Sequence, residues 1–281
     1  MIYTNRSGFK ACTFAIANAA LLLTVACLHP DAARADTHSS SKAKSAIPDW
    51  NGVWVIADSF MDKQDGASVA APGRFDPSQT RSANLPLFKG DYLKKVLELQ
   101  NAQRDGRPVQ DRGAQCLPQG MPSFWGGPYA FEIVQTDKQI NVYQEWNEQT
   151  RRLYLDGRPH PSADVLDPSY NGHSIGTWQA GVLHVDTVAI RADTQLRSGV
   201  GSVGGNHSED LHITERFTSE GKDRLKVEET IEDDKALEKP WLLVIHLHRK
   251  QNMEVAEYVC EENNRNPVGD DGVTRTTLKS Q

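Results

Sequence analysis

Two histidines stand directly before serines, His173-Ser174 and His207-Ser208, each at the start of a predicted strand. Imidazole changes charge near neutral pH, so two rings that face one cavity can serve as base and acid. Neighbouring side chains on an extended strand point to opposite faces, so neither His-Ser pair is a catalytic dyad by itself. We therefore expect His173 and His207 to approach each other at the open end of a barrel, where one ring removes a proton from a substrate.

Carboxylates and a guanidinium in nearby turns complete this candidate site. Asp156 follows a predicted strand and Glu145 ends another, so either carboxylate can return the proton that an imidazole removes. Arg158, in the same turn as Asp156, is suited to binding a carboxylate or phenolate group. The other candidate substrate-binding side chains are His160, Tyr143, Trp125 and Trp178. Each of these residues also has a structural interpretation, as part of a turn, an ion pair or the core.

Several further polar residues on the predicted strands are interpreted as structural. Asp186 is expected to bond a neighbouring loop, and Glu215 and Arg216 are expected to form a cross-strand ion pair. His184 and His212 alternate with apolar neighbours, which predicts that both lie on the solvent face.

Other kinds of catalytic centre are not indicated. The sequence has no Gly-x-Ser-x-Gly motif, no phosphate-binding loop and no dinucleotide-binding glycine motif that leads into a helix. The glycine-rich run over 198–205 is expected to be a loop or lid. His246 and His248 share a strand face and could supply two metal ligands, but no third ligand is evident. We expect no metal and no cofactor, and a metal-dependent enzyme ranks as the last alternative.

These residues favour a cofactor-independent enzyme, a lyase, isomerase or dehydratase, that acts on a small, largely apolar or aromatic molecule. The alternative is a non-catalytic binding protein for a small hydrophobic ligand. Several titratable groups with perturbed pKa values inside the barrel would favour the enzyme, whereas an apolar interior with one polar anchor would favour the binding protein.

The elements that must position these residues are predominantly β-strands. From Tyr129 onward apolar residues alternate with polar ones, and Gly-containing turns separate the segments. The predicted strands are 51–57, 129–135, 139–146, 150–155, 174–179, 182–190, 210–217, 224–232, 241–249 and 255–260. Short connections predict an antiparallel meander, and about ten strands are expected to close into a barrel. A helix over 91–105, with Asp91 as its N-cap, is the only substantial helix predicted.

The first predicted strand carries Gly52-Val53-Trp54, which resembles the Gly-x-Trp that opens lipocalin-type barrels. The resemblance implies that Trp54 is buried at one end of the barrel. An insertion over 58–128 departs from a plain lipocalin.

The N-terminal residues indicate export. Arg6 and Lys10 precede an apolar run over 11–26, and Ala33-Arg34-Ala35 matches a signal-peptidase site. The alternative is a lipoprotein anchored at Cys27. We expect a signal peptide over 1–35, a disordered tether over 36–47, one barrel domain over 48–264 and a flexible tail over 265–281, in a periplasmic or secreted protein.

The net charge limits the kinds of partner that are expected, and the cysteines indicate the cellular compartment. The formal net charge is −6 without a basic stripe, which argues against nucleic acid, and no second apolar run predicts a membrane span. Cys12 and Cys27 lie in the leader, so Cys116 and Cys260 remain. In an oxidising compartment they are expected to form one disulfide, the alternative being two buried thiols. The expected partner is a small molecule.

A set of motifs spans roughly residues 116–264: DGRPHP (156–161), GHSIGTW (172–178), VDT (185–187), HS (207–208), ERF (215–217) and EYVCEEN (257–263). As a set it resembles a family of exported proteins of soil and aquatic Gram-negative bacteria. The resemblance implies a shared fold and a shared site, and no particular reaction.

Overall fold

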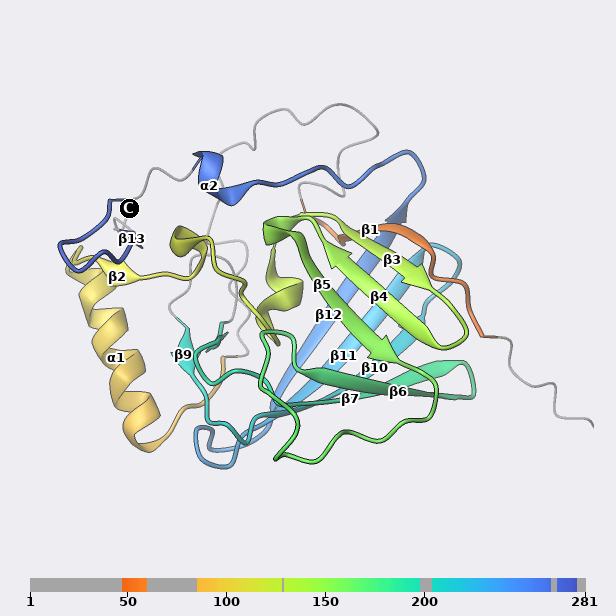
Figure 1. Ribbon diagram of the computed structural model, residues 1–281, viewed down its shortest axis with the longest axis horizontal. Helices are drawn as coiled ribbons and strands as arrows, with labels where there is room; N and C mark the ends of the chain where they lie inside the picture. The colour runs from red at the N-terminus through yellow and green to blue at the C-terminus, as the bar shows by residue number, and fades with distance from the viewer. Residues whose placement is uncertain (1–46, 60–84, 128, 198–203, 264–266, 277–281) are drawn as a thin grey trace, which may run out of the picture. The chain divides into compact units, whose positions relative to one another are not determined.

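The computed structural model describes residues 47–59, 85–127, 129–197, 204–263 and 267–276 (Figure 1). All of them belong to the second of two units into which the chain divides, residues 44–281. The predicted signal peptide, nearly all of the predicted tether, residues 60–84 of the insertion and residues 198–203 of the glycine-rich run lie outside the described residues. No helix in the described ranges is long and apolar enough to cross a membrane.

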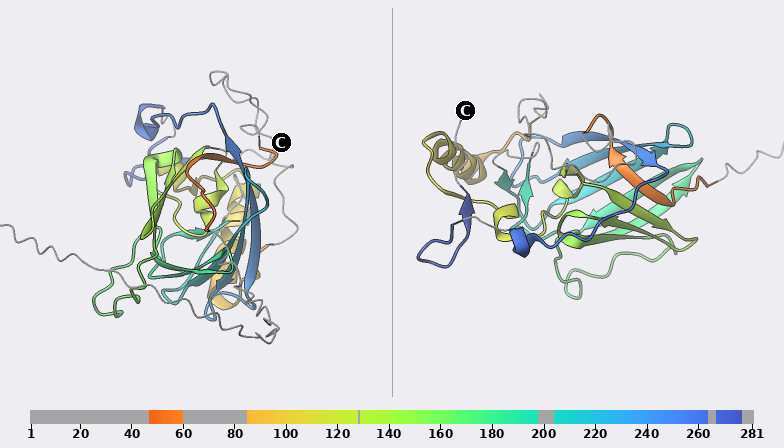
Figure 2. Two further views of the ribbon diagram at one scale, coloured as in Figure 1. Left: turned by 90° about the vertical axis from the view of Figure 1, so that its right-hand side faces the viewer. Right: turned by 90° about the horizontal axis from the view of Figure 1, so that it is seen from above.

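Nine strands form a closed barrel, which confirms the prediction of an all-β, lipocalin-like barrel. They are β1 (Gly52–Ile56), β3 (Phe131–Gln135), β4 (Gln139–Gln144), β5 (Gln149–Tyr154), β6 (His173–Gln179), β7 (Val182–Val188), β10 (His212–Ser219), β11 (Arg224–Glu232) and β12 (Trp241–Lys250). The order around the barrel is β1-β12-β11-β10-β7-β6-β5-β4-β3, and β1 closes it by pairing with both β12 and β3. Figure 2 shows these strands around a common interior.

The period-two pattern of the sequence sets which side chains face the interior. In β11, every second residue is buried, namely Leu225, Val227, Glu229 and Ile231, and their neighbours are more exposed. The interior therefore holds one contiguous apolar core, to which nearly every barrel strand contributes.

The predicted meander is wrong at one point, because β5 and β6 are parallel. Parallel neighbours need a crossover connection, and residues 155–172 therefore run from one end of the barrel to the other between these strands. This segment, the crossover, carries Asp156, Arg158 and His160.

The last predicted strand, 255–260, does not form. Residues after β12 instead run as an extended strap to the short helix α2 (Cys260–Asn263) (Figure 1). Met253 and Val255 of this strap pack against Val53, Val55 and Ala130. The apolar residues that suggested a strand thus cover part of the barrel wall.

Trp54 is fully buried, as the Gly-x-Trp resemblance implies. Its indole nitrogen donates to the backbone oxygen of Trp50 over 2.8 Å, and the Arg249 guanidinium lies 4.7 Å from its ring. Trp50 packs against Trp178 with ring centroids 4.9 Å apart and donates to the Ser219 hydroxyl. These residues fill the end of the barrel at which β1 begins.

The predicted helix over 91–105 is present as α1 (Gly90–Arg104). The residue at its N-cap position is Lys89, and Asp91 lies inside the first turn, where it pairs with Lys94. Val96 is its main contact with the apolar core.

Short elements of the insertion close the other end of the barrel. The turns η2 (Gly113–Gln115) and η3 (Ser123–Gly126) follow β2 (Val109–Gln110), and η4 (Trp146–Glu148) follows β4. Phe124 and Trp125 of η3 are buried in the core. The remaining short strands are β8 (Gln195–Leu196), which pairs with β9 (Gly205–Asn206), and β13 (Arg275–Thr276), which pairs with β2. The predicted flexible tail thus contributes β13.

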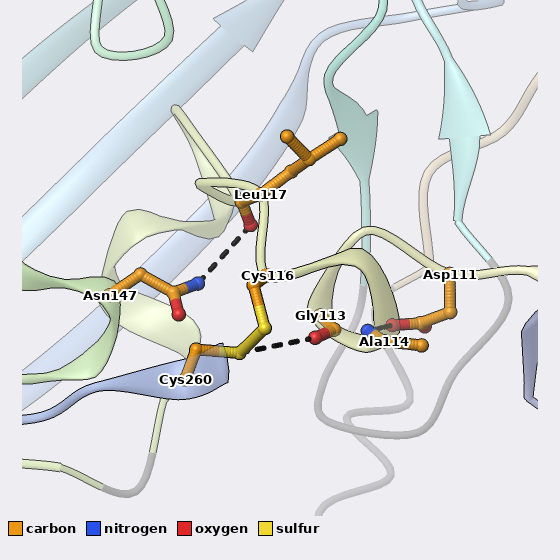
Figure 3. Close-up of a disulfide and its surroundings, with 7 residues drawn as sticks. All are labelled: Asp111, Gly113, Ala114, Cys116, Leu117, Asn147 and Cys260. Carbon is orange, nitrogen blue, oxygen red and sulfur yellow. Dashed lines mark hydrogen bonds between the residues drawn. A yellow bond between two sulfur atoms is a disulfide. The ribbon is translucent and has the colours of Figure 1, made fainter. Parts of the chain in front are cut away.

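The predicted disulfide between Cys116 and Cys260 is confirmed, with Cα atoms 5.5 Å apart (Figure 3). It joins the residue after η2 to the first residue of α2. The bridge therefore ties the strap to the insertion rather than to a last strand.

Candidate functional site

Among the described residues, three ionisable side chains lie inside the barrel, Arg151 of β5, Glu215 of β10 and Glu229 of β11, each 1% exposed. Each occupies an inward position in its strand. Arg151 lies two residues before buried Leu153, and Glu229 lies between buried Val227 and Ile231. The same alternation that builds the core therefore delivers these groups to the interior.

Arg151 and Glu215 form a buried ion pair with several supporting bonds. The Arg151 Nη1 donates to Glu215 Oε1 over 2.8 Å, and its Nη2 donates to Glu215 Oε2. The same Nη2 also donates to the hydroxyls of Thr187 and Ser174, over 3.0 and 3.2 Å. The Trp125 indole donates to Glu215 Oε1 over 3.4 Å. Glu215 accepts bonds from both Arg151 and Trp125, so it is the carboxylate that balances the Arg151 charge in the interior.

Glu229 is paired in register with Glu215 on the neighbouring strand. Burial raises the pKa of Glu229 well above its usual range, and the negative charge of Glu215 raises it further. Neither Glu229 oxygen has a hydrogen-bond partner in the described chain while both carboxyls are ionised. A proton on Glu229 removes the repulsion and lets Glu229 donate to Glu215. We infer that the two glutamates share one proton; below they are called the carboxyl pair.

Glu229 lines a cavity of about 950 Å³. The cavity lies beside the end of β1, which pairs with Leu247–Lys250 of β12, and the preceding β12 residues Leu243 and Ile245 line it. Its interior apolar lining is formed by Trp125, Leu225, Leu243, Ile245 and Leu247. Exposed charged residues, such as Arg224, lie at its rim.

Gln119 is a second buried polar residue of this cavity. It precedes η3, lines the cavity and is 3% exposed. Its amide nitrogen has no hydrogen-bond partner in the described part of the chain. The cavity thus combines apolar walls with a protonated carboxyl and an unpaired amide, the composition expected of a small-molecule site.

A second group of polar residues, which includes the predicted site residues His160 and His173, lies elsewhere, on the outer wall of the barrel. The Nδ1 atoms of His160 and His173 are 2.7 Å apart, and the Nε2 of His160 lies 2.9 Å from Asp186 Oδ1. The other oxygen of Asp186 lies 2.9 Å from the Nε2 of His212. We call these four residues, together with Tyr154, Asp156 and Arg158, the wall cluster.

Aromatic and ionic contacts extend the wall cluster toward the start of the crossover. The Tyr154 ring stacks on His173 with centroids 5.2 Å apart, and the Arg158 guanidinium lies 4.1 Å from the centroid of the Tyr154 ring. Asp156 accepts two bonds from the Nε of Arg158 and one from its Nη2, which holds the pKa of Asp156 at about 2. Arg158 is therefore occupied by a neighbour rather than presented to a substrate anion.

The backbone before His173 explains how the crossover enters β6. Gly172 has a φ of +65°, and a Cβ there would lie 2.6 Å from the backbone oxygen of Val188. Only glycine fits this turn. Burial, followed by the neighbouring His160 and Arg158, lowers the pKa of His173, so its ring is neutral at neutral pH. The wall cluster can relay a proton, but none of its residues lines the cavity.

The predicted pairing of His173 with His207 does not form. His207 is 2% exposed, and both of its ring nitrogens are already engaged, Nε2 with the Thr194 hydroxyl and Nδ1 with the Ser208 backbone oxygen. Burial lowers the pKa of His207. Ser208 is bound by Asp233 through its backbone nitrogen and its hydroxyl. His207 and Ser208 therefore stabilise a turn, because their polar groups are hydrogen-bonded to Thr194, to Asp233 and to the local backbone.

The remaining predicted site residues are dispersed. Glu145 is buried, accepts a bond from the backbone nitrogen of Ala256 in the strap, and has its pKa raised by burial. Tyr143 lies half-buried on β4, and its pKa is raised by desolvation and nearby glutamates. Trp178 packs on Trp50 at the end of the barrel where β1 begins. Of the predicted set, Trp125 alone is among the residues that line the cavity.

A signal for the interior group was present in the sequence. Arg151, Glu215 and Glu229 occur at the same alternating positions as buried apolar residues. Because charged residues are almost never fully buried unless they are paired, this pattern indicates side chains that point into the barrel and interact there. The expected cross-strand pair of Glu215 with Arg216 is wrong, since Glu215 points inward and pairs with Arg151, whereas Arg216 is exposed. Asp186 does bond the loop residue His160, as expected.

Neither a scan against protein-family models nor a search of the curated proteins finds a match to this chain.

Proposed function

We propose that the protein is a cofactor-independent enzyme that binds a small, largely apolar molecule in the barrel cavity and transfers protons to and from it. The observation that carries the proposal is that Glu229, a buried carboxyl opposite the ionised Glu215, lines the cavity. Strongly perturbed carboxyls in a cleft are typical of acid–base catalysts.

The carboxyl pair suits reactions that both give and take a proton. Protonated Glu229 donates its proton to an atom of the bound molecule and becomes a carboxylate opposite Glu215. Because two neighbouring buried carboxylates repel each other, Glu229 is then a strong base and takes a proton from a second atom of the same molecule. An isomerisation, elimination or dehydration fits this sequence of steps, since the enzyme ends with its original proton count.

The geometry favours a carboxyl over an imidazole for this role. The sequence favours His173 and His207 for proton transfer, but neither lines the cavity. His173 stays a second candidate because Asp186, through His160, orients it as carboxylates orient catalytic histidines. A non-catalytic binding protein is the alternative function, which the mainly apolar cavity walls support.

The compartment belongs to the same proposal. A disulfide and the absence of a membrane-spanning helix in the described ranges fit an extracellular or periplasmic protein. We place it in the periplasm, with cleavage after Ala35; lipidation at Cys27 is the alternative.

Deuterium incorporation tests the proposed chemistry whatever the net reaction is. The protein is incubated in D₂O with a panel of small aromatic ketones and β-hydroxy ketones, and mass spectrometry and NMR detect exchange or conversion. We expect at least one compound to gain deuterium or react, and Glu229→Gln to reduce that rate by about 10²–10⁴-fold.

Two variants separate the alternatives. If His173→Ala abolishes the exchange and Glu229→Gln does not, the wall cluster is the catalytic site. If the panel displaces the neutral fluorescent probe N-phenyl-1-naphthylamine but no compound exchanges or reacts, the protein is a binding protein.

A further inference from the structure

The cavity contains one buried polar group that no described protein atom satisfies, the Gln119 amide nitrogen, and one buried carboxyl, Glu229, whose single proton can turn from Glu215 to a ligand. Both side chains are almost completely buried. Leaving a buried polar group unpaired is destabilising, so a group of this kind in a native protein calls for an explanation. In a cavity, the natural explanation is that it binds a ligand atom of complementary character.

The charges around the cavity argue against an anionic ligand. Arg151, the interior cation, already directs its Nη atoms at Glu215, Ser174 and Thr187. Arg197, which also lines the cavity, forms an ion pair with Asp111 over 2.6 Å. A carboxylate in the interior would therefore lie near Glu215 without a cation of its own, and desolvation would oppose it.

The unpaired Gln119 nitrogen argues against a cationic ligand. An amide N–H is a donor, and an ammonium group presents only donors, so the two repel rather than bond. An ammonium also requires Glu229 to ionise beside Glu215, its register partner. A neutral ligand with an acceptor oxygen satisfies Gln119 directly and can accept the Glu229 proton as well.

We propose that the natural ligand is a neutral, largely apolar molecule with a carbonyl oxygen that accepts hydrogen bonds from Gln119 and Glu229. This inference rests on the proposed use of the cavity and names its substrate class. A carbonyl bound in this way is polarised toward an enol, which agrees with proton transfer at a neighbouring carbon.

Four probes with one ring system test the ligand class by titration calorimetry at neutral pH: 2-acetylnaphthalene, 2-ethylnaphthalene, 2-naphthoate and 2-naphthylmethylammonium. We expect acetylnaphthalene to bind about tenfold more tightly than each of the others, as one or two satisfied buried hydrogen bonds allow. Gln119→Leu should reduce the difference in affinity between the acetyl and ethyl compounds, because one of the two proposed donors is lost, while leaving the ethyl compound's affinity unchanged.

The unliganded Gln119→Leu variant supplies a second readout. Since the Gln119 nitrogen has no described partner, replacing it by an apolar side chain of similar length should not lower the unfolding free energy. A large loss of stability would mean that Gln119 has a structural role, and would contradict the inference.

Other results overturn the inference as well. These are equal or tighter binding of the naphthoate or the ammonium, equal binding of the acetyl and ethyl compounds to the unaltered protein, and no binding of any probe, since the cavity has room for each. If acetylnaphthalene binds as expected but no ketone in the panel exchanges deuterium, the ligand class stands and the proposed proton transfer fails.

Discussion

Glu215 and Glu229 lie directly opposite each other on β10 and β11, so two buried carboxyls face one interior guanidinium, that of Arg151. One positive charge balances one carboxylate. The second carboxyl is therefore neutral, and this arrangement leads to the first two predictions.

Arg151→Met should lower the unfolding free energy by about 3–5 kcal/mol, because it leaves the buried Glu215 without its cation. Urea unfolding at pH 7 measures this loss. The double variant Arg151→Met/Glu215→Gln removes both charges and should recover at least half of it. A single variant within about 1 kcal/mol of the unaltered protein would show that the pair is less buried than the structure indicates.

Glu229→Gln should change how stability depends on pH. Because the pKa of Glu229 is raised in the folded protein, the folded state holds a proton that the unfolded state releases above about pH 4.5. The contribution of Glu229 is thus complete below that pH and declines as the pH rises toward the folded pKa. The variant has no such decline, so its stability relative to the unaltered protein should increase from pH 5 to pH 8, by at most about 1.4 kcal/mol per pH unit. If the unfolding free energies of the variant and of the unaltered protein, measured with urea, change equally with pH over this range, the prediction is wrong.

His207 should have the opposite dependence. Burial lowers its pKa, so the unfolded state binds a proton more readily than the folded state. Its contribution to stability is complete above about pH 6.5 and falls as the pH decreases below that value. His207→Gln should therefore flatten the loss of stability between pH 7 and pH 5. His184→Gln, at a partly exposed ring on the outer face of β7, is the matched control for removal of an imidazole.

Removal of the disulfide should cost more than loss of most single side chains. Cys116 and Cys260 are 144 residues apart, and closing a loop of that length stabilises a fold by about 4–5 kcal/mol in the chain-entropy model. Cys116→Ser/Cys260→Ser should lose about this amount in urea unfolding. Addition of a reductant should reproduce the loss in the unaltered protein and change nothing in the variant.

Asp186→Asn should loosen the crossover without unfolding the barrel. Asp186 bonds His160 of the crossover and His212 of β10, but its side chain is 41% exposed, so the change in global stability should stay below about 1 kcal/mol. Hydrogen–deuterium exchange over residues 155–172 should become faster. His184→Gln, on the same face of β7, should leave this exchange unaltered; equal acceleration in both variants would mean that the wall cluster does not hold the crossover.

The fold could be predicted in large part because alternation and short turns are local signals. The strand Arg224–Glu232, for example, has the bounds that the alternation of apolar and polar residues predicts. Gly52 and Trp54 indicate the position of the first strand. The sequence of residues 255–260 does not distinguish an extended strap from a strand. Val255 is buried against the barrel in the strap and would also suit a strand, so only tertiary packing decides between the two.

The site was harder to predict because it depends on which face each side chain takes across distant strands. The cluster of His160 with His173 follows from the parallel pairing of β5 and β6, which no local pattern indicates. The carboxyl pair depends on the register that brings Glu215 opposite Glu229. Histidines are the titratable groups that a sequence makes obvious, whereas the burial that raises the pKa of Glu229 exists only in the folded barrel.

The position of β1 in the barrel has a consequence for how the chain folds. Trp54 pairs with Phe131 on one side and with Arg249 of β12 on the other, so the first strand of the barrel needs the last one to close it. Such distant pairings slow folding, because a long loop must be ordered before any contact stabilises it. As the chain is made from its N-terminus, β1 can pair with β3 early, but its other edge stays open until β12 is available. Over that interval the chain exposes open strand edges, which makes it a natural client for a holding chaperone.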